Sequence, residues 1–581
     1  MLDTTLATDF IPGTNLKDAV AGANWLFLLP SLEVARIVSV GVPPLSTLST
    51  LSKLAQSVTV LCSSATELRY LSSLVDKSNL QRITSNRIND CTSLVFEEQS
   101  IDVLLIVPGI GAKSLLLSDS LCTQLRNGLS SQGVTFVDLG CPHSSAPSVS
   151  TLSGKLAQFG FPSLYWMTPI ACREMQGAVP LTYSTVIDYF CEKNLYGAHF
   201  RSRPLRTVEG FLARQPAFNR MFRRCGAMIV SSGSQATGQP PQYLKGIAEN
   251  CGVCIDDLEW GLSAMGNYNS RKVLFFLFDR STTMPRFVAK ITRTPELNYR
   301  LENEYKALKL LNRLTIPPES IPQPAFFGHH AGLAILGQSA VDGVPFRDAT
   351  TRSPNCQLIR AAVDWLITLG ALTQDPDAST PADIAHVLRI LFRRFVAIYR
   401  LTPEQHTYLT DQIGSLEDLP YRIPLVFQHG DPGTWNVLVT HSRRVAFLDW
   451  EAAEPRGMPL WDLFYFLRSC IATATRSRRA RRFLAPFLQN MHHDSRFGSL
   501  MHDSTKRYCE TLQIPFEIVR PLFLTCWMHR ALKEATRLTP ARLEDGHYVN
   551  LLRHYIQHPN HTFPASCPPV SVWPCPAITN S

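Results

Sequence analysis

The loop from His429 to Asn436 carries residue types that suit the transfer of a phosphoryl group. Asp431 and Asn436 are separated by four residues, and an apolar run delivers Asp449 thirteen residues after Asn436. A carboxylate can accept the proton of an acceptor hydroxyl, and amide and carboxylate oxygens suit Mg²⁺. The spacing therefore predicts Asp431 as a catalytic base, with Asn436 and Asp449 as ligands of a magnesium ion.

Apolar runs beside this loop predict the strands that hold it. Val437 to Val439 and Val445 to Leu448 are apolar, and the polar stretch His441 to Arg444 between them is typical of a hairpin turn. Asn436 and Asp449 would then lie at adjacent strand ends. A single carboxylate or amide at a strand end is usually an ordinary turn former, so the argument rests on the combination and its spacing.

A cation and an acid upstream extend the set. Lys290 is the charged residue of the apolar run Phe287 to Ile291, and Glu304 lies among apolar residues at helical spacing. A strand-borne Lys paired with a helix-borne Glu positions nucleotide phosphates in kinases. We therefore predict that Lys290 and Glu304 bind ATP. The alternative is a strand-edge charge and a solvated helix face.

These motifs resemble those of the aminoglycoside phosphotransferase and choline kinase family over residues 255 to 555. The residues that carry the resemblance are His429-Gly430-Asp431, Asn436, Asp449-Trp450-Glu451 and Pro459-Leu460-Trp461-Asp462-Leu463. The resemblance implies a bilobal protein-kinase-like fold, ATP and Mg²⁺ as cofactors, and a hydroxylated small molecule as substrate, such as a sugar, an aminoglycoside or an amino alcohol. It also implies that Asp462 braces the catalytic loop and that His429 is a structural loop residue.

The first 230 residues predict a different fold. Apolar runs at Val34 to Val40, Val58 to Leu61, Ile101 to Val107 and Val134 to Leu139 alternate with plausible helices. This alternation predicts a Rossmann-like, doubly wound α/β domain. The layout resembles a class I S-adenosylmethionine-dependent methyltransferase, with a closing strand at Met228-Ile229-Val230.

Two contacts that such a methyltransferase makes with its cofactor look degraded. Gly41 is followed by Val42-Pro43-Pro44 where a glycine-rich turn is needed, and Cys62-Ser63-Ser64 stands where an acid would bind ribose hydroxyls. We therefore expect an inactive domain that does not bind S-adenosylmethionine. Asp102 is then expected to be a structural residue at a strand start.

Length and composition predict several domains. The chain has 581 residues, of which 45% are hydrophobic, enough for two or three cores. The stretch from Ser231 to Pro241 is a linker by composition. The predicted parts are an N-terminal extension at 1–20, a methyltransferase-like domain at 21–231, a linker at 232–250, a kinase-like N-lobe at 251–341, a helical C-lobe at 342–557 and a Pro-rich tail at 558–581.

Charge and targeting signals narrow the partners. The net charge is +9, and five arginines crowd Arg476 to Arg482, either as a solvated loop or to attract an anionic substrate or nucleotide. No nucleic-acid-binding signature accompanies them, so we expect no nucleic-acid partner. The apolar patch Trp25 to Leu29 is too short for a membrane span or signal peptide, and the 15 cysteines are scattered, with one isolated Cys251-x-x-Cys254. These features predict a cytoplasmic protein.

Taken together, the sequence predicts an ATP-dependent phosphotransferase fused to a methyltransferase-like domain. A bifunctional kinase and methyltransferase, or a pseudokinase scaffold, stay open as alternatives. Trp461, Tyr465 and Trp527 lie in predicted helices and are either an aromatic surface for the acceptor or part of the core.

Overall fold

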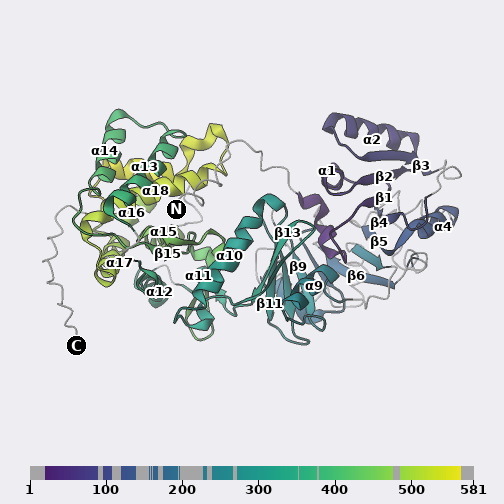
Figure 1. Ribbon diagram of the computed structural model, residues 1–581, viewed down its shortest axis with the longest axis horizontal. Coiled ribbons are helices and arrows are strands. Elements are labelled where there is room, and N and C mark those ends of the chain that lie inside the picture. The colour runs from purple at the N-terminus through teal and green to yellow at the C-terminus, as the bar shows by residue number, and fades with distance from the viewer. Residues whose placement is uncertain are drawn as a thin grey trace. The chain divides into compact units, whose positions relative to one another are not determined.

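The computed structural model describes most of the chain in two compact units. The described residues are 20–88, 96–107, 119–138, 156, 159, 161–167, 175–193, 195, 227–231, 238–265, 271–350, 353–375, 379–475 and 484–563. One unit, here called the sheet unit, comprises Leu16–Glu302 and Pro324–Ala340. The other, here called the helical unit, includes Asn303–Gln323 and Val341–Ser581 (Figure 1).

Parallel strands form the N-terminal part of the sheet unit. Their order is β3 (Ile83–Arg87), β2 (Ser57–Cys62), β1 (Arg36–Val40), β4 (Ile101–Ile106) and β5 (Leu129–Asp138). Four of them, all but β3, coincide with the predicted apolar runs. Burial on both faces explains those runs, because a strand covered on both sides needs no polar alternation.

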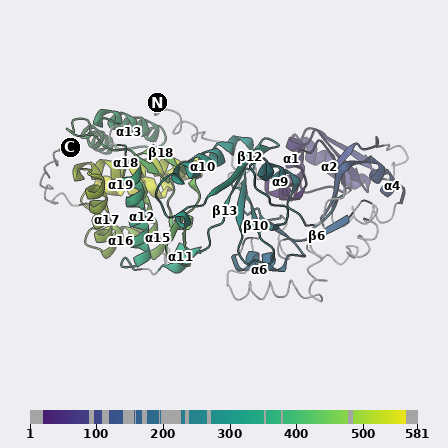
Figure 2. The same cartoon turned by 60° about the horizontal axis from the view of Figure 1, so that its bottom comes forward.

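Helices cover the two faces of these strands. Leu48 of α1 (Leu45–Leu54) and Leu71 of α2 (Ala65–Ser78) share one core with η1 (Val20–Leu28), whose Trp25 stacks on Phe136 of β5 at 4.5 Å between ring centroids. Leu121 and Leu125 of α4 (Asp119–Gly128) pack in the core of the opposite face. The predicted Rossmann-like architecture is confirmed (Figures 1 and 2).

The same sheet continues into strands of the C-terminal half. The predicted closing strand is β8 (Ala227–Ser231), which runs antiparallel between β5 and β6 (Phe161–Met167). β6 pairs with β7 (Gly177–Pro180), and β7 pairs with β9 (Glu259–Ser263). Antiparallel strands β10 (Val273–Phe278), β11 (Phe287–Ile291), β13 (Leu333–Ser339) and β12 (Pro324–His330) complete a sheet of 13 strands.

A short helix fastens the N-terminal chain to this extension. Helix α9 (Gln242–Asn250) occupies the last part of the segment predicted as a linker, and the hydroxyl of its buried Tyr243 donates to the Phe27 carbonyl at 2.9 Å. The Tyr243 ring stacks on His330 of β12, whose Nε2 accepts the Leu32 N–H at 3.1 Å. Another helix of this unit, α6 (Ser184–Lys193), packs Phe190 against Phe276 of β10. The predicted domain boundaries stay a prediction.

The helical unit is dominated by α-helices. They are α11 (Phe346–Ala349), α12 (Gln357–Thr373), α13 (Pro381–Val396), α14 (Pro403–Gly414), α15 (Trp461–Thr475), α16 (Leu484–Met491), α17 (Arg496–Leu512), α18 (Val519–Ala535) and α19 (His547–Gln557). Thr380 and Thr402 form capping boxes with proline at the next position, which fixes the starts of α13 and α14. Helix α10 (Asn298–Leu311) crosses the boundary of the units at Asn303.

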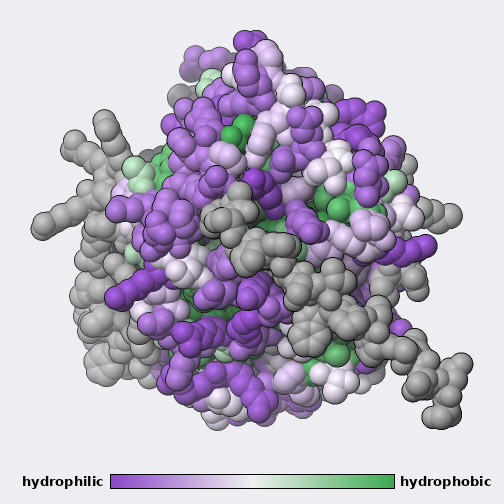
Figure 3. Space-filling model, turned by 90° about the vertical axis from the view of Figure 1, so that its left-hand side faces the viewer, coloured by the Kyte–Doolittle hydropathy of each residue, from purple (hydrophilic) through white to green (hydrophobic). Residues whose placement is uncertain are grey.

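The core and the surface of this unit follow its sequence patterns. Thirteen residues of α18 are buried, and this helix packs against α13, α14, α15 and α19. Figure 3 shows one face of the unit as mainly hydrophilic, with small hydrophobic patches. None of the helices within the described ranges combines the length and the apolar sequence needed to cross a membrane.

Candidate functional site

A short hairpin brings Asn436 and Asp449 to the same end of two strands. β16 (Val437–Val439) and β17 (Val445–Phe447) pair antiparallel, with Val437 opposite Phe447. The Leu448 N–H then donates to the Asn436 carbonyl at 2.8 Å. Because Asp449 follows Leu448 directly, the predicted hairpin is confirmed and its two oxygen-bearing residues are neighbours across it.

Asn436 is also hydrogen-bonded to Asp431. Its Nδ2 donates to the Asp431 carbonyl at 2.9 Å and to Asp431 Oδ2 at 3.2 Å. Since the amide nitrogen is used in this way, the amide oxygen is left to face another partner. Asn436 therefore links the carboxylate predicted to act as a base to the position predicted to hold a metal.

Asp449 adopts a backbone conformation that few side chains adopt. Its φ of 66° and ψ of 64° lie in the left-handed region, at the start of η7 (Trp450–Ala452). Such conformations are costly for residues other than glycine and gather at functional sites. An amide oxygen and a carboxylate are the hard ligands that Mg²⁺ prefers, so the donor set of Asn436 and Asp449 fits this ion.

Asp462, in the first turn of α15, is hydrogen-bonded to the backbone of the loop that carries Asp431. Its two carboxylate oxygens accept the backbone N–H groups of His429 at 2.5 Å and of Gly430 at 3.2 Å. Burial raises the pKa of Asp462, while the charge of Arg530 and the two N–H donors act to lower it. The geometry is that of the bracing role implied by the family resemblance.

His429 uses both ring nitrogens within the loop. The Asp431 N–H donates to Nδ1 at 3.2 Å, so the hydrogen is on Nε2, which donates to the Leu448 carbonyl at 2.9 Å. The ring is fully buried and packs on Trp450, with 4.3 Å between ring centroids. Both ring nitrogens are engaged in hydrogen bonds within the loop, which agrees with a structural role.

The loop also requires glycine at position 430. Gly430 has a φ of 77°, and a Cβ atom there would lie 1.9 Å from the carbonyl oxygen of Ala452. No side chain fits in that space.

Two residues around Asp431, Arg530 and Trp435, were not predicted. Arg530 of α18 places Nη1 3.5 Å from Asp431 Oδ1, and its guanidinium stacks 3.3 Å above the ring of Tyr465. Burial lowers the pKa of Arg530, but Tyr465 and Asp431 raise it by more. Trp435 Nε1 donates to Asp431 Oδ2 at 3.4 Å, and this residue is 53% exposed. No local pattern distinguishes Arg530 from the other charged residues of its helix.

The three aromatic candidates fall in different places. Tyr465 lies beside Arg530, and its hydroxyl is 3.4 Å from that of Tyr548. Trp527 is fully buried and stacks on Tyr548. Trp461 is buried with Nε1 donating to the Leu522 carbonyl, which makes it a core residue.

Lys290 and Glu304 lie on the predicted types of element. Lys290 is on β11, opposite Leu336 of β13, and is buried. Glu304 is on α10 and is fully buried. They belong to different compact units, and their pairing stays a prediction. Asn303 anchors α10 within the helical unit, because its Nδ2 donates to the carbonyls of Glu451 and Ala453 at 3.0 and 2.8 Å.

In Rossmann-like domains, S-adenosylmethionine binds at the carboxyl ends of the parallel strands, here those of β1 and β2. Beyond Gly41, whose φ is 92°, Pro44 caps α1 without a side-chain hydrogen bond. Beyond β2, the carboxylate of Glu67 accepts the N–H and hydroxyl of Ser63 at 2.7 Å each. The carboxylate of Glu67 is thus committed to the start of α2, and the expectation that these strand ends do not bind S-adenosylmethionine stays a prediction.

Two further predictions concern Asp102 and the basic segment Arg476 to Arg482. Asp102 Oδ2 accepts the N–H groups of Ala35 and Arg36 at 3.1 and 2.8 Å, which is a structural role at the start of β1. The basic segment Arg476 to Arg482 lies outside the described residues.

Comparisons with solved structures found several similar proteins. The chain is similar to the macrolide 2'-phosphotransferase MphH from Brachybacterium faecium, at 18% identity over 51% of this chain and 95% of that chain, with a TM-score of 0.30. It is also similar to the choline kinase LicA from Streptococcus pneumoniae, at 12% identity over 51% of this chain and 92% of that chain, with a TM-score of 0.31. A third similar structure is the bifunctional kinase-methyltransferase WbdD, at 13% identity over 81% of this chain and 84% of that chain, with a TM-score of 0.22. No curated protein matches the chain.

A sequence model of the phosphotransferase enzyme family, APH, matches residues 272–496 of the chain. This stretch contains all seven residues predicted for the site, namely Lys290, Glu304, His429, Asp431, Asn436, Asp449 and Asp462. Residues 272–496 therefore match the phosphotransferase enzyme family, APH.

Proposed function

We propose that this domain transfers the γ-phosphoryl group of ATP to a hydroxyl of a small molecule in the presence of Mg²⁺. The observation that carries the proposal is the double hydrogen bond from Asn436 Nδ2 to Asp431. It holds a base and a metal ligand in one rigid loop, and Asp449 lies next to Asn436 across the hairpin.

Each residue has one role in the proposed reaction. Asp431 orients the acceptor hydroxyl and takes its proton. Asn436 and Asp449 hold Mg²⁺, which neutralises charge on the phosphates, and Lys290, oriented by Glu304, contacts the phosphates. Catalysis then consists mainly of placement and electrostatic stabilisation, so a loop fixed by Asp462 is a functional requirement.

The charge around Asp431 favours a neutral or anionic acceptor, such as a sugar. Arg530 is buried and charged beside Asp431, so the pair offers little net negative charge to a cation. An aminoglycoside or a quaternary amine would meet this guanidinium beside the proposed base. The exposed ring of Trp435 offers an apolar face beside the base, which suits a polyhydroxylated ring.

The methyltransferase-like domain has a different proposed role. Because the strand ends at Gly41 and Ser63 are predicted not to bind S-adenosylmethionine, we expect it to act as a scaffold continuous with the kinase strands through β7 and β9. A bifunctional enzyme would require binding of this cofactor.

The test incubates the full-length protein with Mg-ATP and a panel of acceptors. The panel contains neutral methyl glycosides, sugar phosphates, aminoglycosides, choline and ethanolamine, and phosphorylated products are detected by mass spectrometry. We expect product from a neutral or anionic sugar. Product from the cationic acceptors alone would overturn the proposed acceptor class but leave the phosphotransferase. Binding of Mg-ATP without any turnover would favour the pseudokinase alternative.

A further inference from the structure

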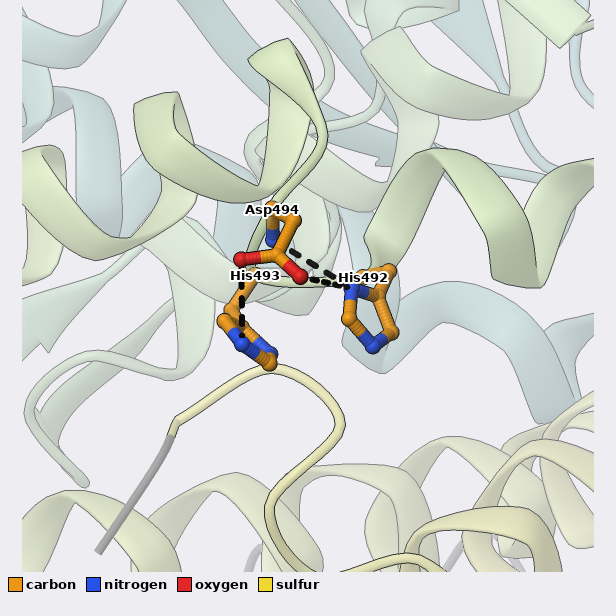
Figure 4. Close-up of side chains that lie close together, drawn as sticks. All are labelled: His492, His493 and Asp494. Atoms are coloured by element: carbon orange, nitrogen blue, oxygen red, sulfur yellow. Dashed lines mark hydrogen bonds and ion pairs between the residues drawn. The ribbon is translucent and has the colours of Figure 1, made fainter. Parts of the chain in front are cut away.

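The turn between α16 and α17 gathers two imidazoles and a carboxylate. Helix α16 ends at Met491 and α17 begins at Arg496, with His492, His493 and Asp494 between them. One ligand atom from each of the three side chains lies within 4.8 Å of the others (Figure 4). Neither the proposed phosphoryl transfer nor the methyltransferase-like fold uses these residues.

The hydrogen bonds of His493 determine which nitrogen faces Asp494. Its backbone N–H and its Nδ1 both lie within hydrogen-bond distance of the His561 carbonyl, at 2.8 and 3.2 Å. A carbonyl can only accept, so Nδ1 carries the hydrogen and a neutral ring has its lone pair on Nε2. That nitrogen lies 3.2 Å from Asp494 Oδ1. Two electron-rich atoms at this distance need a proton or a metal ion between them.

His492 repeats this relationship on the other carboxylate oxygen. Its Nδ1 is 3.5 Å from Asp494 Oδ2 and accepts the Asp494 N–H at 3.3 Å, so a metal ion bound to Nδ1 would replace this hydrogen bond to the backbone. A tetrahedral Zn²⁺ ion with ligand bonds of 2.0–2.2 Å has neighbouring ligand atoms about 3.3–3.5 Å apart. The two N···O distances of 3.2 and 3.5 Å are close to that requirement.

A second layer of histidines supports the turn. His561 Nε2 donates to the Leu488 carbonyl at 2.8 Å, and its Nδ1 accepts from His554 Nε2 at 3.2 Å. Both nitrogens of His561 are used, so this residue orients His493 through its carbonyl and does not itself bind a metal. Metal-bound histidines characteristically donate their second N–H to a carbonyl in this way.

We propose that His492, His493 and Asp494 bind a divalent transition-metal ion such as Zn²⁺. The two imidazoles and one carboxylate match the borderline preference of this ion, and the partly exposed histidines and exposed carboxylate leave a coordination position for water. Through the contact of His493 with His561, the ion would fasten the turn to the segment that follows α19.

The test uses the full-length protein freed of metal with a chelator and titrated with Co²⁺, then Zn²⁺. Co²⁺ bound to nitrogen and oxygen gives visible d–d absorption without the thiolate charge-transfer band of a cysteine site. We expect one such ion per chain, displaced by Zn²⁺. His493→Ala and Asp494→Asn should each weaken binding at least about tenfold.

A matched control lies on the next helix. His502 Nδ1 is 3.6 Å from Asp503 Oδ1, but within the described residues no third ligand joins this pair. His502→Ala should keep the Co²⁺ spectrum and affinity. If His493→Ala does not fold, the exposed Asp494→Asn decides the question. The proposal is overturned if the spectrum shows thiolate ligation, if no d–d band develops, or if Asp494→Asn binds with unchanged affinity.

Discussion

Arg530 Nη1 lies 3.5 Å from Asp431 Oδ1, and the same guanidinium stacks on Tyr465. The carboxylate proposed as the base is thus held from one side by a buried arginine and from the other by Asn436 and Trp435. These contacts fix the orientation of the base before any acceptor binds, which is how a largely electrostatic mechanism gains its rate.

Replacing Arg530 should therefore impair transfer more than it impairs nucleotide binding. Removing one partner of a buried charge pair costs about 3 kcal/mol. In Arg530→Gln we expect kcat/KM for the acceptor to fall about 100-fold with little change in Mg-ATP affinity. Arg507→Gln is the control, because Arg507 pairs with Asp364 at an exposed position of α17. Unchanged kcat/KM in Arg530→Gln would exclude a role in holding the base.

Asp462 should be a stability determinant as well as a loop brace. Asp462→Ala leaves the N–H groups of His429 and Gly430 without their acceptor in a buried site. We expect the free energy of unfolding to fall by about 3 kcal/mol or more, measured by urea denaturation. Asp503→Asn, at an exposed carboxylate, should change it little. Equal stabilities for both variants would contradict the bracing role.

His547 should make the stability of the helical unit depend on pH. Arg468 Nε donates to its Nε2 at 3.2 Å, and burial followed by the charge of Arg468 lowers the pKa of His547 to about 3. In the unfolded state the His547 side chain binds a proton near pH 6.5, so above that pH its titration does not lower the free energy of unfolding. Below pH 6.5, the free energy of unfolding falls by about 1.4 kcal/mol per pH unit as the pH drops toward about 3.

The measurement compares urea denaturation of the wild-type protein and His547→Gln at pH 7, 6 and 5. In the variant, the free energy of unfolding should depend less steeply on pH, by an amount that corresponds to about one proton taken up on unfolding. His386→Gln, at an exposed position of α13, serves as the control. Parallel slopes for the wild type and His547→Gln would show that His547 does not titrate on unfolding.

The two halves should respond differently to their family cofactors. We expect Mg-ATP to raise the melting temperature of the full-length protein, and S-adenosylmethionine to leave it unchanged, because the strand ends at Gly41 and Ser63 are predicted not to bind that molecule. A clear thermal shift with S-adenosylmethionine would restore the bifunctional alternative.

Local patterns made much of this fold predictable from the sequence. The hairpin that presents Asn436 and Asp449 depends on residues within fifteen positions of each other, and β11 coincides with the run predicted around Lys290. The N-terminal strands were equally visible, because strands buried on both faces are continuous apolar runs.

Features that depend on long-range contacts were not predictable. β7 has four residues, and nothing local shows that it pairs with β9 to join two sheets. Arg530 lies almost a hundred residues beyond Asp431, in a helix whose arginine looks like any other charge in a periodic pattern. The orientation of His493 likewise depends on the carbonyl of His561.

Asp431→Asn tests the central claim most directly. Asparagine keeps the size of the side chain but cannot accept the acceptor's proton, while Asn436 and Asp449 remain in place to hold Mg²⁺. The measurement is single-turnover transfer of labelled phosphate from ATP to the acceptor found in the panel, alongside Mg-ATP binding by calorimetry. The account predicts loss of transfer by at least about 100-fold with Mg-ATP binding retained. Transfer at the wild-type rate in Asp431→Asn would contradict it.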